Sequence, residues 1–178
     1  MHATACPLTL VRIVDSLTFK TPETDTEWNA YHRIREHVLW ELRGQFSVYD
    51  RFHPEEDHNE KCPKILFLNG DPIGVVRIDF IEETEEAAFR KVAINPENQR
   101  KGYGKELMRL SEEFAVSKGY TNFFANVSLD AVGFYRNVGY SPNPKHSENN
   151  PSYPRMEKQI STNKSVRTIR DSSADPLV

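Results

Sequence analysis

The sequence has few cysteines and no long apolar run, and both absences limit what the protein can be. Only Cys6 and Cys62 occur among 178 residues, far apart and without zinc-type spacing, so we expect no disulfide framework and no metal. Two free thiols suit a reducing compartment. No stretch approaches the roughly 20 apolar residues that a bilayer requires, and no basic segment followed by an apolar core opens the chain. We therefore expect a cytoplasmic protein without a membrane partner.

A strong excess of basic charge is also absent. The formal net charge is −3, which offers no general attraction to nucleic acid, and we predict no nucleic-acid partner. The length suits one domain with a sizeable core and is short for two. We expect that domain over residues 1–160, followed by a polar and loosely ordered tail over 161–178.

The common nucleotide-binding glycine patterns are missing as well. The chain has neither Gly-x-x-x-x-Gly-Lys-Ser/Thr nor Gly-x-Gly-x-x-Gly followed by an acid about twenty residues later. Nucleoside triphosphates and dinucleotides are therefore disfavoured. What the chain does have is one glycine-bearing basic loop, Gln-Arg-Lys-Gly-Tyr-Gly, over residues 99–104.

This basic loop lies between a strand pattern and a helix pattern. The run over 87–94 is apolar and partly β-branched and ends at Asn-Pro, which is typical of a strand before a turn. After the loop, Leu107, Leu110 and Phe114 recur at three and four residues and predict an amphipathic helix. A helix start beside basic side chains favours a phosphate group, although glycine turns before helices are also common in proteins that bind none.

The remaining segments predict a mixed α/β, or α+β, domain. We expect a strand over 9–14, then a helix capped by Asp25 or Thr26 and stopped by Gly44, and then a long polar loop over 45–63. Strands over 64–68 and 73–80, joined by an Asn-Gly turn, precede the central strand over 87–94. After the basic loop and its helix we expect a strand over 120–127, a short helix over 128–138, a proline-rich loop over 141–154 and a strand over 155–160. The strand over 120–127 should lie parallel to the central strand because a helix joins them.

Two motifs resemble those of one family. Gln99, Gly102 and Gly104 fit the Gln/Arg-x-x-Gly-x-Gly/Ala signature of the GNAT superfamily of N-acetyltransferases. About thirty residues later, residues 131–140 resemble that family's Ala-x-x-Phe-Tyr-x-x-x-Gly-Phe element, with Tyr140 in place of the usual Phe. Both motifs in this order identify the chain as a member, over roughly residues 8–160. The resemblance implies a single-domain GNAT-like fold: a mixed, mainly antiparallel twisted sheet of six to seven strands, about four helices, and a central parallel strand pair that splays apart.

The resemblance also implies a cosubstrate, acetyl-CoA, and the residues that bind it. The free backbone of the central strand would pair with the pantetheine arm, and N–H groups of the basic loop would hold the pyrophosphate. The cofactor-binding residues implied in this way are Val92, Ala93, Ile94, Gln99, Arg100, Lys101, Gly102, Tyr103, Gly104, Lys105 and Phe134. Asn126, at the end of the neighbouring strand, could hydrogen-bond the cofactor or cap the strand edge.

For catalysis the resemblance implies Tyr135 as the acid that protonates or stabilises the leaving thiolate. The base is open, because the resemblance implies either a Glu or Asp near the central strand or a water chain to solvent. Asp79, Glu36 and Glu41 are the candidate carboxylates, and a surface or salt-bridge role suits each of them too. Three arginines could line the acceptor cleft and favour an acceptor with a carboxylate or phosphate, although structural ion pairs are the commoner role; they are Arg35, Arg77 and Arg90.

The function expected from these features is transfer of an acetyl group to a primary amine of a small molecule or peptide, by direct attack in a ternary complex. The alternative is a non-catalytic acyl-CoA-binding sensor or interaction domain. The residues do not identify the acceptor, and the chain could assemble as a homodimer, as family members often do.

Overall fold

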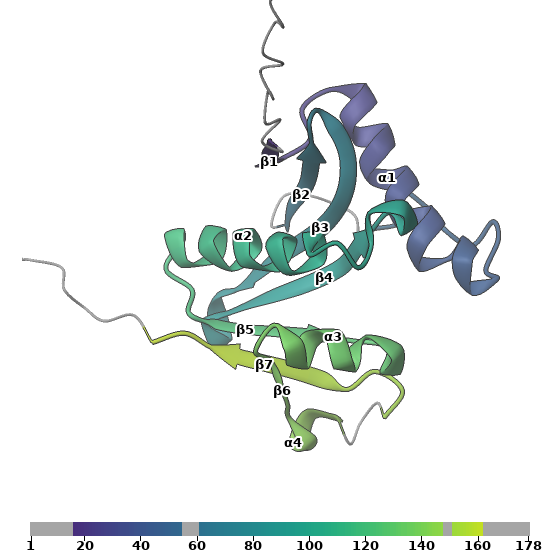
Figure 1. Cartoon of the computed structure of the whole chain (residues 1–178). Helices are drawn as coiled ribbons and strands as arrows, with labels where there is room; N and C mark the ends of the chain where they lie inside the picture. Colours follow the sequence, from purple (N-terminus) through teal and green to yellow (C-terminus); the bar gives the residue numbers. More distant parts are fainter. Residues whose placement is uncertain (1–15, 55–60, 148–150, 162–178) are drawn as a thin grey trace, which may run out of the picture.

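The computed structural model describes residues 16–54, 61–147 and 151–161, and these form one mixed sheet with helices on both faces. The sheet has the strand order β1-β2-β3-β4-β5-β7-β6. Its strands are β1 (Leu17–Lys20), β2 (Lys61–Leu68), β3 (Asp71–Ile81), β4 (Glu86–Ile94), β5 (Asn122–Asn126), β6 (Ser141–Pro142) and β7 (Arg155–Gln159). The helices are α1 (Asp25–Leu39), α2 (Tyr103–Ser117), α3 (Val132–Asn137) and α4 (Pro144–Ser147). The predicted fold class is confirmed (Figure 1).

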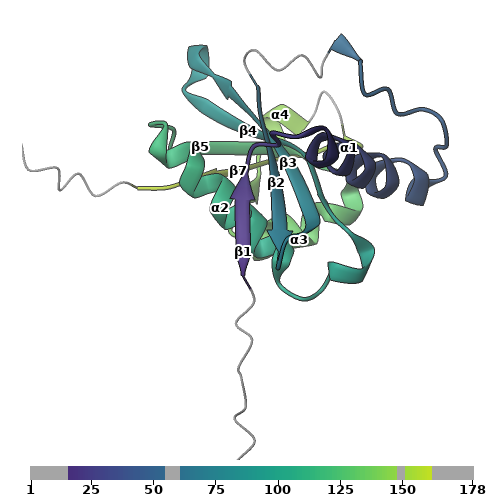
Figure 2. The same cartoon turned by 90° about the horizontal axis from the view of Figure 1, so that it is seen from above.

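The two faces of the sheet carry separate apolar clusters. On one face α2 and α3 cover a core that includes Leu107, Phe89 and Met156. On the other face α1 lays Tyr31 and Ile34 against the strands. Figure 2 shows α1 on one side of the strands and α2 and α3 on the other. Burial of both apolar helix stripes fixes the helices against the sheet, and the strand ends between them are left to form a site.

Most predicted elements lie where the sequence patterns place them. The turn between β2 and β3 has positive φ at Asn69 (54°) and Gly70 (91°), as the tight Asn-Gly hairpin requires. Strand β4 and helix α2 fall on the predicted central strand and the helix that follows the basic loop. Strands β4 and β5 pair in parallel, as the connecting helix predicts.

The first helix differs from the prediction at both ends. Its N-cap is Thr24, whose side chain accepts from the backbone N–H of Glu27 while the Glu27 carboxylate accepts from the backbone of Thr24. This reciprocal capping box places the start one residue before the predicted caps. The α-helix ends at Leu39, and a 3₁₀ turn, Glu41–Arg43, carries the chain to the left-handed Gly44. Leu42 therefore leaves the apolar stripe and lies 56% exposed.

Some short elements were not predicted. The stretch expected to be a proline-rich loop contains β6 and α4, and the expected short helix divides into a 3₁₀ turn, Leu129–Ala131, and α3. Strand β2 begins at Lys61, inside the predicted long loop. The strand predicted over 9–14 and the tail beyond 161 lie outside the described residues, and β1 was not predicted.

The feature that positions the site is the separation of β4 from β5. Their parallel register holds from Glu86–Asn122 to Ala88–Phe124 and goes no further in the described chain. The splayed pair is thus confirmed. Farther along β4 the register against β3 shifts, because Lys91 and Val92 together oppose Val76, and Lys91 adopts φ 54°. This is a β-bulge, which bends the strand beside the gap.

Candidate active site

The basic loop ends in a helix start that no side chain caps. Gly102 is the N-cap of α2 with φ 91°, and Arg100 before it also has positive φ, 59°. Glycine suits this position because a Cβ strains the left-handed region, and it leaves the first backbone N–H groups of the helix open. Lys105 lies in the first turn. Together these groups offer hydrogen-bond donors and positive charge to an anion.

Two further residues of the signature, Gln99 and Gly104, have structural roles that the sequence did not predict. The Gln99 side chain donates a 2.8 Å hydrogen bond to the carbonyl of Ile94 and ties the loop to the end of β4. Gly104 has no positive φ. A Cβ on it would lie 3.2 Å from the ring of Phe134, so glycine there allows α2 to pack closely on α3. From the sequence alone, both glycines are expected to have positive φ and to let phosphate approach the backbone. Positive φ is confirmed for Gly102 and wrong for Gly104, and the approach of phosphate stays a prediction.

A cleft of about 650 Å³ runs from this loop along β4 to α3, and we call it the basic-loop cleft. Its walls include most of the residues that the sequence predicted for cofactor binding: Val92, Ala93, Ile94, Gln99, Arg100, Gly102, Gly104, Lys105 and Phe134. Lys101 and Tyr103 lie in the same loop and helix start without lining the cleft. Most of the predicted cofactor-binding residues therefore lie together in the wall of the basic-loop cleft.

A second cavity, of about 470 Å³, lies beside the strand ends, and we call it the Trp40 hollow. Trp40, Lys91, Asn126 and Tyr153 are among its walls. Asn126 thus lies on this side of the gap and does not line the basic-loop cleft. The two cavities share the wall residues Leu39, Arg43, Val92, Ala131 and Tyr135. They therefore meet at the gap between β4 and β5, with Tyr135 at the junction.

Tyr135 is both a core residue and a wall of the two cavities. Its side chain is 5% exposed, and its ring makes edge contacts with Phe134 at 5.3 Å and with Tyr140 at 5.4 Å. No residue in the described ranges hydrogen-bonds its hydroxyl. Burial raises the pKa of the Tyr135 phenol above its ordinary value, because the phenolate loses hydration there. The group is therefore a protonated donor at neutral pH.

Tyr140, which replaces the usual Phe of the motif, belongs to a buried polar network behind Tyr135. Its hydroxyl donates to Glu112 of α2 at 3.1 Å, and Lys158 of β7 donates to the other carboxylate oxygen at 2.7 Å. Lys158 also donates to the carbonyl of Val138 at 3.0 Å. Burial, followed by the nearby carboxylate, raises the pKa of Tyr140. The sequence signal for this network was the extra hydroxyl at position 140, which sequence reasoning left unexplained.

The carboxylates considered as bases lie elsewhere. Asp79 on β3 lines neither cavity, and its oxygens accept from Arg77 at 2.8 Å and from Arg90 at 2.7 Å. Asp79 is thus held in an ion-pair cluster on the sheet and is not brought to Tyr135. Glu41 pairs with Arg33 and His37, and Glu36 lies near Arg33. The described walls of the Trp40 hollow contain no carboxylate and no imidazole.

The arginines expected at the acceptor cleft are also placed differently. Arg35 is fully buried, donates to the Tyr31 hydroxyl at 3.2 Å and lies against the rings of Tyr31 and Tyr49. Arg77 and Arg90 hold Asp79. The cationic residues that do line the Trp40 hollow are Arg43 and Lys91. Sequence patterns could not single them out because the chain carries many basic residues at loops and strand ends.

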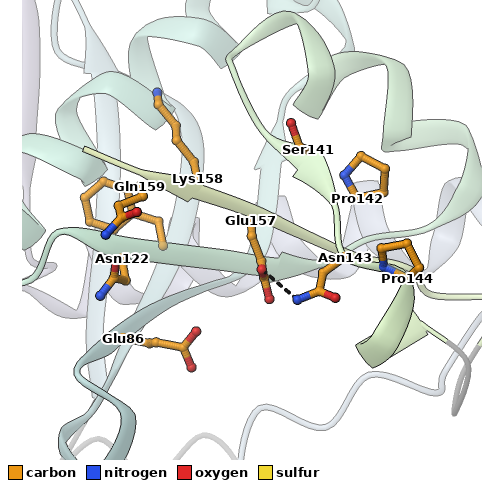
Figure 3. A pocket seen from close by; sticks show the side chains of 10 residues that line it. Glu86, Asn122, Ser141, Pro142, Asn143, Pro144, Glu157, Lys158 and Gln159 are labelled. Atoms are coloured by element: carbon orange, nitrogen blue, oxygen red, sulfur yellow. Dashed lines mark hydrogen bonds between the residues drawn. The ribbon is translucent and has the colours of Figure 1, made fainter. Parts of the chain in front are cut away.

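A separate depression of about 430 Å³ lies at the far edge of the sheet (Figure 3). The Asn143 amide there donates to Glu157 at 2.9 Å, and Arg155 bridges Glu157 and Glu86. Its walls share no residue with the two cavities around Tyr135. These bonds link β7 to β4 and to the segment between β6 and α4.

Neither a metal site nor a membrane span is found in the part of the chain that the structure describes. No group of three His, Cys, Asp or Glu side chains there could hold an ion. None of the helices in those ranges has the length and apolar character that crossing a membrane requires. Cys62 is a half-buried free thiol on β2, away from both cavities, and Cys6 lies outside the described residues.

Comparison with protein families places the chain in a known class, the acyltransferases. The model of the acetyltransferase (GNAT) family matches residues 25–140, which is more than half of the chain. The chain therefore belongs to the GNAT acetyltransferase family, and the resemblance inferred from the two motifs is confirmed.

Individual relatives agree with this assignment. The uncharacterized protein YyaT of Bacillus subtilis (strain 168) is 26% identical over 149 residues, covering 83% of this chain and 99% of YyaT. The crystal structure of a Lactobacillus plantarum protein that is assigned as an N-acetyltransferase has a TM-score of 0.67 at 24% identity, over 83% of this chain and 99% of that one. The PaiA N-acetyltransferase of Thermoplasma acidophilum, solved in complex with coenzyme A, has a TM-score of 0.65 at 17% identity, over 82% and 99%. At these identities the solved structures show a shared fold.

Proposed function

We propose that the protein transfers an acetyl group from acetyl-CoA to a primary amine of a small molecule or peptide, by direct attack within a ternary complex. The observation that carries this proposal is the meeting of the basic-loop cleft and the Trp40 hollow at Tyr135. Two substrates that enter from opposite sides can come into contact there. A binding domain without catalysis would need only one of the two cavities.

The residues of the basic-loop cleft fit acetyl-CoA. The start of α2 has open N–H groups next to Arg100 and Lys105, which suits a pyrophosphate. Beyond Ala88 the edge of β4 that faces β5 is not paired with that strand, so the backbone of Val92 to Ile94 can pair with an extended amide-bearing arm. When bound, acetyl-CoA supplies the acetyl group as an activated thioester.

Tyr135 would act as the acid. The C–N bond forms as the C–S bond breaks, and the Tyr135 hydroxyl is the buried donor at the junction that can give a proton to the departing sulfur. The proton that the acylated nitrogen then loses restores the phenol. Cys62 is unsuited to a covalent acyl-enzyme role because it lines neither cavity, and Cys6 lies outside the described residues. Direct attack is therefore the route that these residues support.

The proton of the acceptor ammonium has to leave before attack. Since the described walls of the Trp40 hollow hold no carboxylate or imidazole, we propose that water in the hollow carries this proton to solvent. Asp79, the base suggested by sequence, is paired with Arg77 and Arg90 and does not reach this position.

The experiment combines two readouts on the full chain. Acetyl-CoA is titrated calorimetrically, and free thiol release is then measured with a library of primary amines. We expect saturable binding and amine-dependent thiol release. Binding without release for any amine would support the acyl-CoA sensor instead, and absence of binding would reject both functions.

A further inference from the structure

Tyr135 is carried by a helix that is too short to hold it in place. Helix α3 has six residues, and no side chain caps its start. An isolated helix of this length is not stable in water, so the direction of the Tyr135 ring depends on contacts outside the helix. The turn that ends α3 and the elements that pack on it therefore decide where the phenol points.

The C-terminal end of α3 is a Schellman turn that contains Tyr135 itself. Gly139 has φ 94°, and its backbone N–H donates to the carbonyl of Arg136 at 3.0 Å. The N–H of the next residue, Tyr140, donates to the carbonyl of Tyr135 at 3.0 Å, and the two rings meet edge-on at 5.4 Å. These are the two hydrogen bonds and the side-chain contact of that motif. The position of Tyr140 therefore sets that of Tyr135.

A buried carboxylate anchors this turn to the rest of the fold. Glu112 of α2 accepts from the Tyr140 hydroxyl at 3.1 Å and from Lys158 of β7 at 2.7 Å. Lys158 also donates, at 3.0 Å, to the carbonyl of Val138, the C-cap of α3. Since Tyr140 and Val138 both belong to the turn, Glu112 and Lys158 hold it at two points.

The anchoring side chains lie outside the two cavities. Glu112, Tyr140 and Lys158 line neither the basic-loop cleft nor the Trp40 hollow, whereas Tyr135 lines both. A buried ion pair is often no more stable than apolar side chains of the same volume. The use of an ion pair here therefore points to a role in fixing a geometry rather than in adding stability.

We propose that Glu112 is a positioning residue for acetyl transfer: it holds the turn at the end of α3 through Tyr140 and Lys158, and so keeps the Tyr135 hydroxyl at the junction of the two cavities. The inference rests on the proposed function and adds a residue that acts through Tyr135. A reacting group displaced by about 1 Å can lose about a hundredfold in rate, whereas acetyl-CoA would still be held by the basic loop and β4.

The test is a double-mutant cycle on the full chain, measured by thiol release with an active amine and by calorimetric titration of acetyl-CoA. Glu112→Gln should lower kcat about tenfold in the parent chain and less than about twofold in a Tyr135→Phe background, because there is no hydroxyl left to position. The affinity for acetyl-CoA should stay within about twofold. Glu113→Gln is the control, since Glu113 pairs with Arg109 on the exposed face of α2, and it should leave kcat unchanged.

Two further measurements separate positioning from stability. Hydrogen exchange at the backbone N–H groups of Gly139 and Tyr140 should be faster in Glu112→Gln than in Glu113→Gln, because the turn opens more often. The triple variant Glu112→Leu, Tyr140→Phe and Lys158→Met replaces the whole network by apolar side chains. It should fold even where Glu112→Gln does not, and should still lose about tenfold in kcat.

The outcomes distinguish this inference from the proposed function. An equal loss of kcat with and without the Tyr135 hydroxyl, or full kcat in the triple variant, would overturn the positioning role of Glu112 and leave the proposed function standing. Absence of thiol release from the parent chain with every amine would instead reject the proposed function, and this inference with it.

Discussion

The hydroxyl of Tyr140 donates a 3.1 Å hydrogen bond to the buried carboxylate of Glu112. Glu112 is 7% exposed, and its carboxylate has Lys158 as its ionic partner. The network joins α2, the segment that follows α3, and β7 directly behind the ring of Tyr135. A polar residue at this motif position therefore serves to fix the helices that form the wall of the site.

Replacing Tyr140 by Phe should lower the free energy of unfolding by about 1 to 2 kcal/mol, because a buried carboxylate loses one of its donors. Urea denaturation measures this as a lower midpoint. Tyr120→Phe is the matched control, since Tyr120 stacks on Phe80 at 4.5 Å and its hydroxyl bonds no described residue. Equal losses of unfolding free energy in the two variants would show that the hydrogen bond to Glu112 adds no stability.

Replacing Tyr135 by Phe should lower kcat about a hundredfold and leave acetyl-CoA affinity nearly unchanged, because only the proton donor is lost. The ring and its edge contacts with Phe134 and Tyr140 remain. Steady-state thiol release and calorimetric titration measure the two quantities. An unchanged kcat would remove Tyr135 as the acid.

The stability of the fold should fall steeply above about pH 10, where tyrosines of the unfolded chain ionise. Burial raises the pKa of Tyr135 and Tyr140 in the folded state. The unfolded chain therefore binds fewer protons than the folded chain in this range, and the stability that is fully present below pH 10 is lost as the pH rises. Unfolding midpoints from pH 8 to 11 test this. The decline should be shallower in a variant that carries Phe at both positions.

Replacing Gly102 by Ala should weaken acetyl-CoA binding about tenfold or more and cost about 1 kcal/mol of stability. The cause is φ 91° at the helix start that would hold the pyrophosphate. Gly119→Ala is a close control, because Gly119 has φ 94° and equally open surroundings at the other end of α2. It should cost similar stability and spare binding. Similar losses of affinity in both variants would argue against the phosphate cradle.

The long-range plan of the fold could be predicted because strong local patterns specify it. The Asn-Gly turn fixes the β2–β3 hairpin, and the apolar stripe of α2 fixes its buried face. The motif around Gly102 located the cleft. The cap of α1 was missed by one residue because Thr24, Asp25 and Thr26 are all good N-caps, and the reciprocal bond with Glu27 decides among them.

The chemistry of the acceptor side could not be predicted, because it depends on contacts between distant segments. No sequence pattern distinguishes Lys91 and Arg43 from the other basic residues as walls of the Trp40 hollow. The ion pairs of Asp79 with Arg77 and Arg90, which hold its carboxylate on the sheet, are visible only in the structure. Strand β6 has two residues and α4 has four, too few for a periodic pattern. The roles of such short pieces are set by packing.

The bulge in β4 is a feature that the packing of the core does not require. Before it, Phe89 faces the α2 side; after it, Ile94 faces that side again while Ala93 lies under α1, so Lys91 is the one surplus residue in the alternation. A chain shortened by that single position could keep every neighbour in phase and form a straight, regular ladder. Such a domain would pack well, but β4 would no longer bend beside the gap between β4 and β5. We therefore expect that natural relatives with one residue fewer in this strand keep the fold and lack the proposed acetyl transfer.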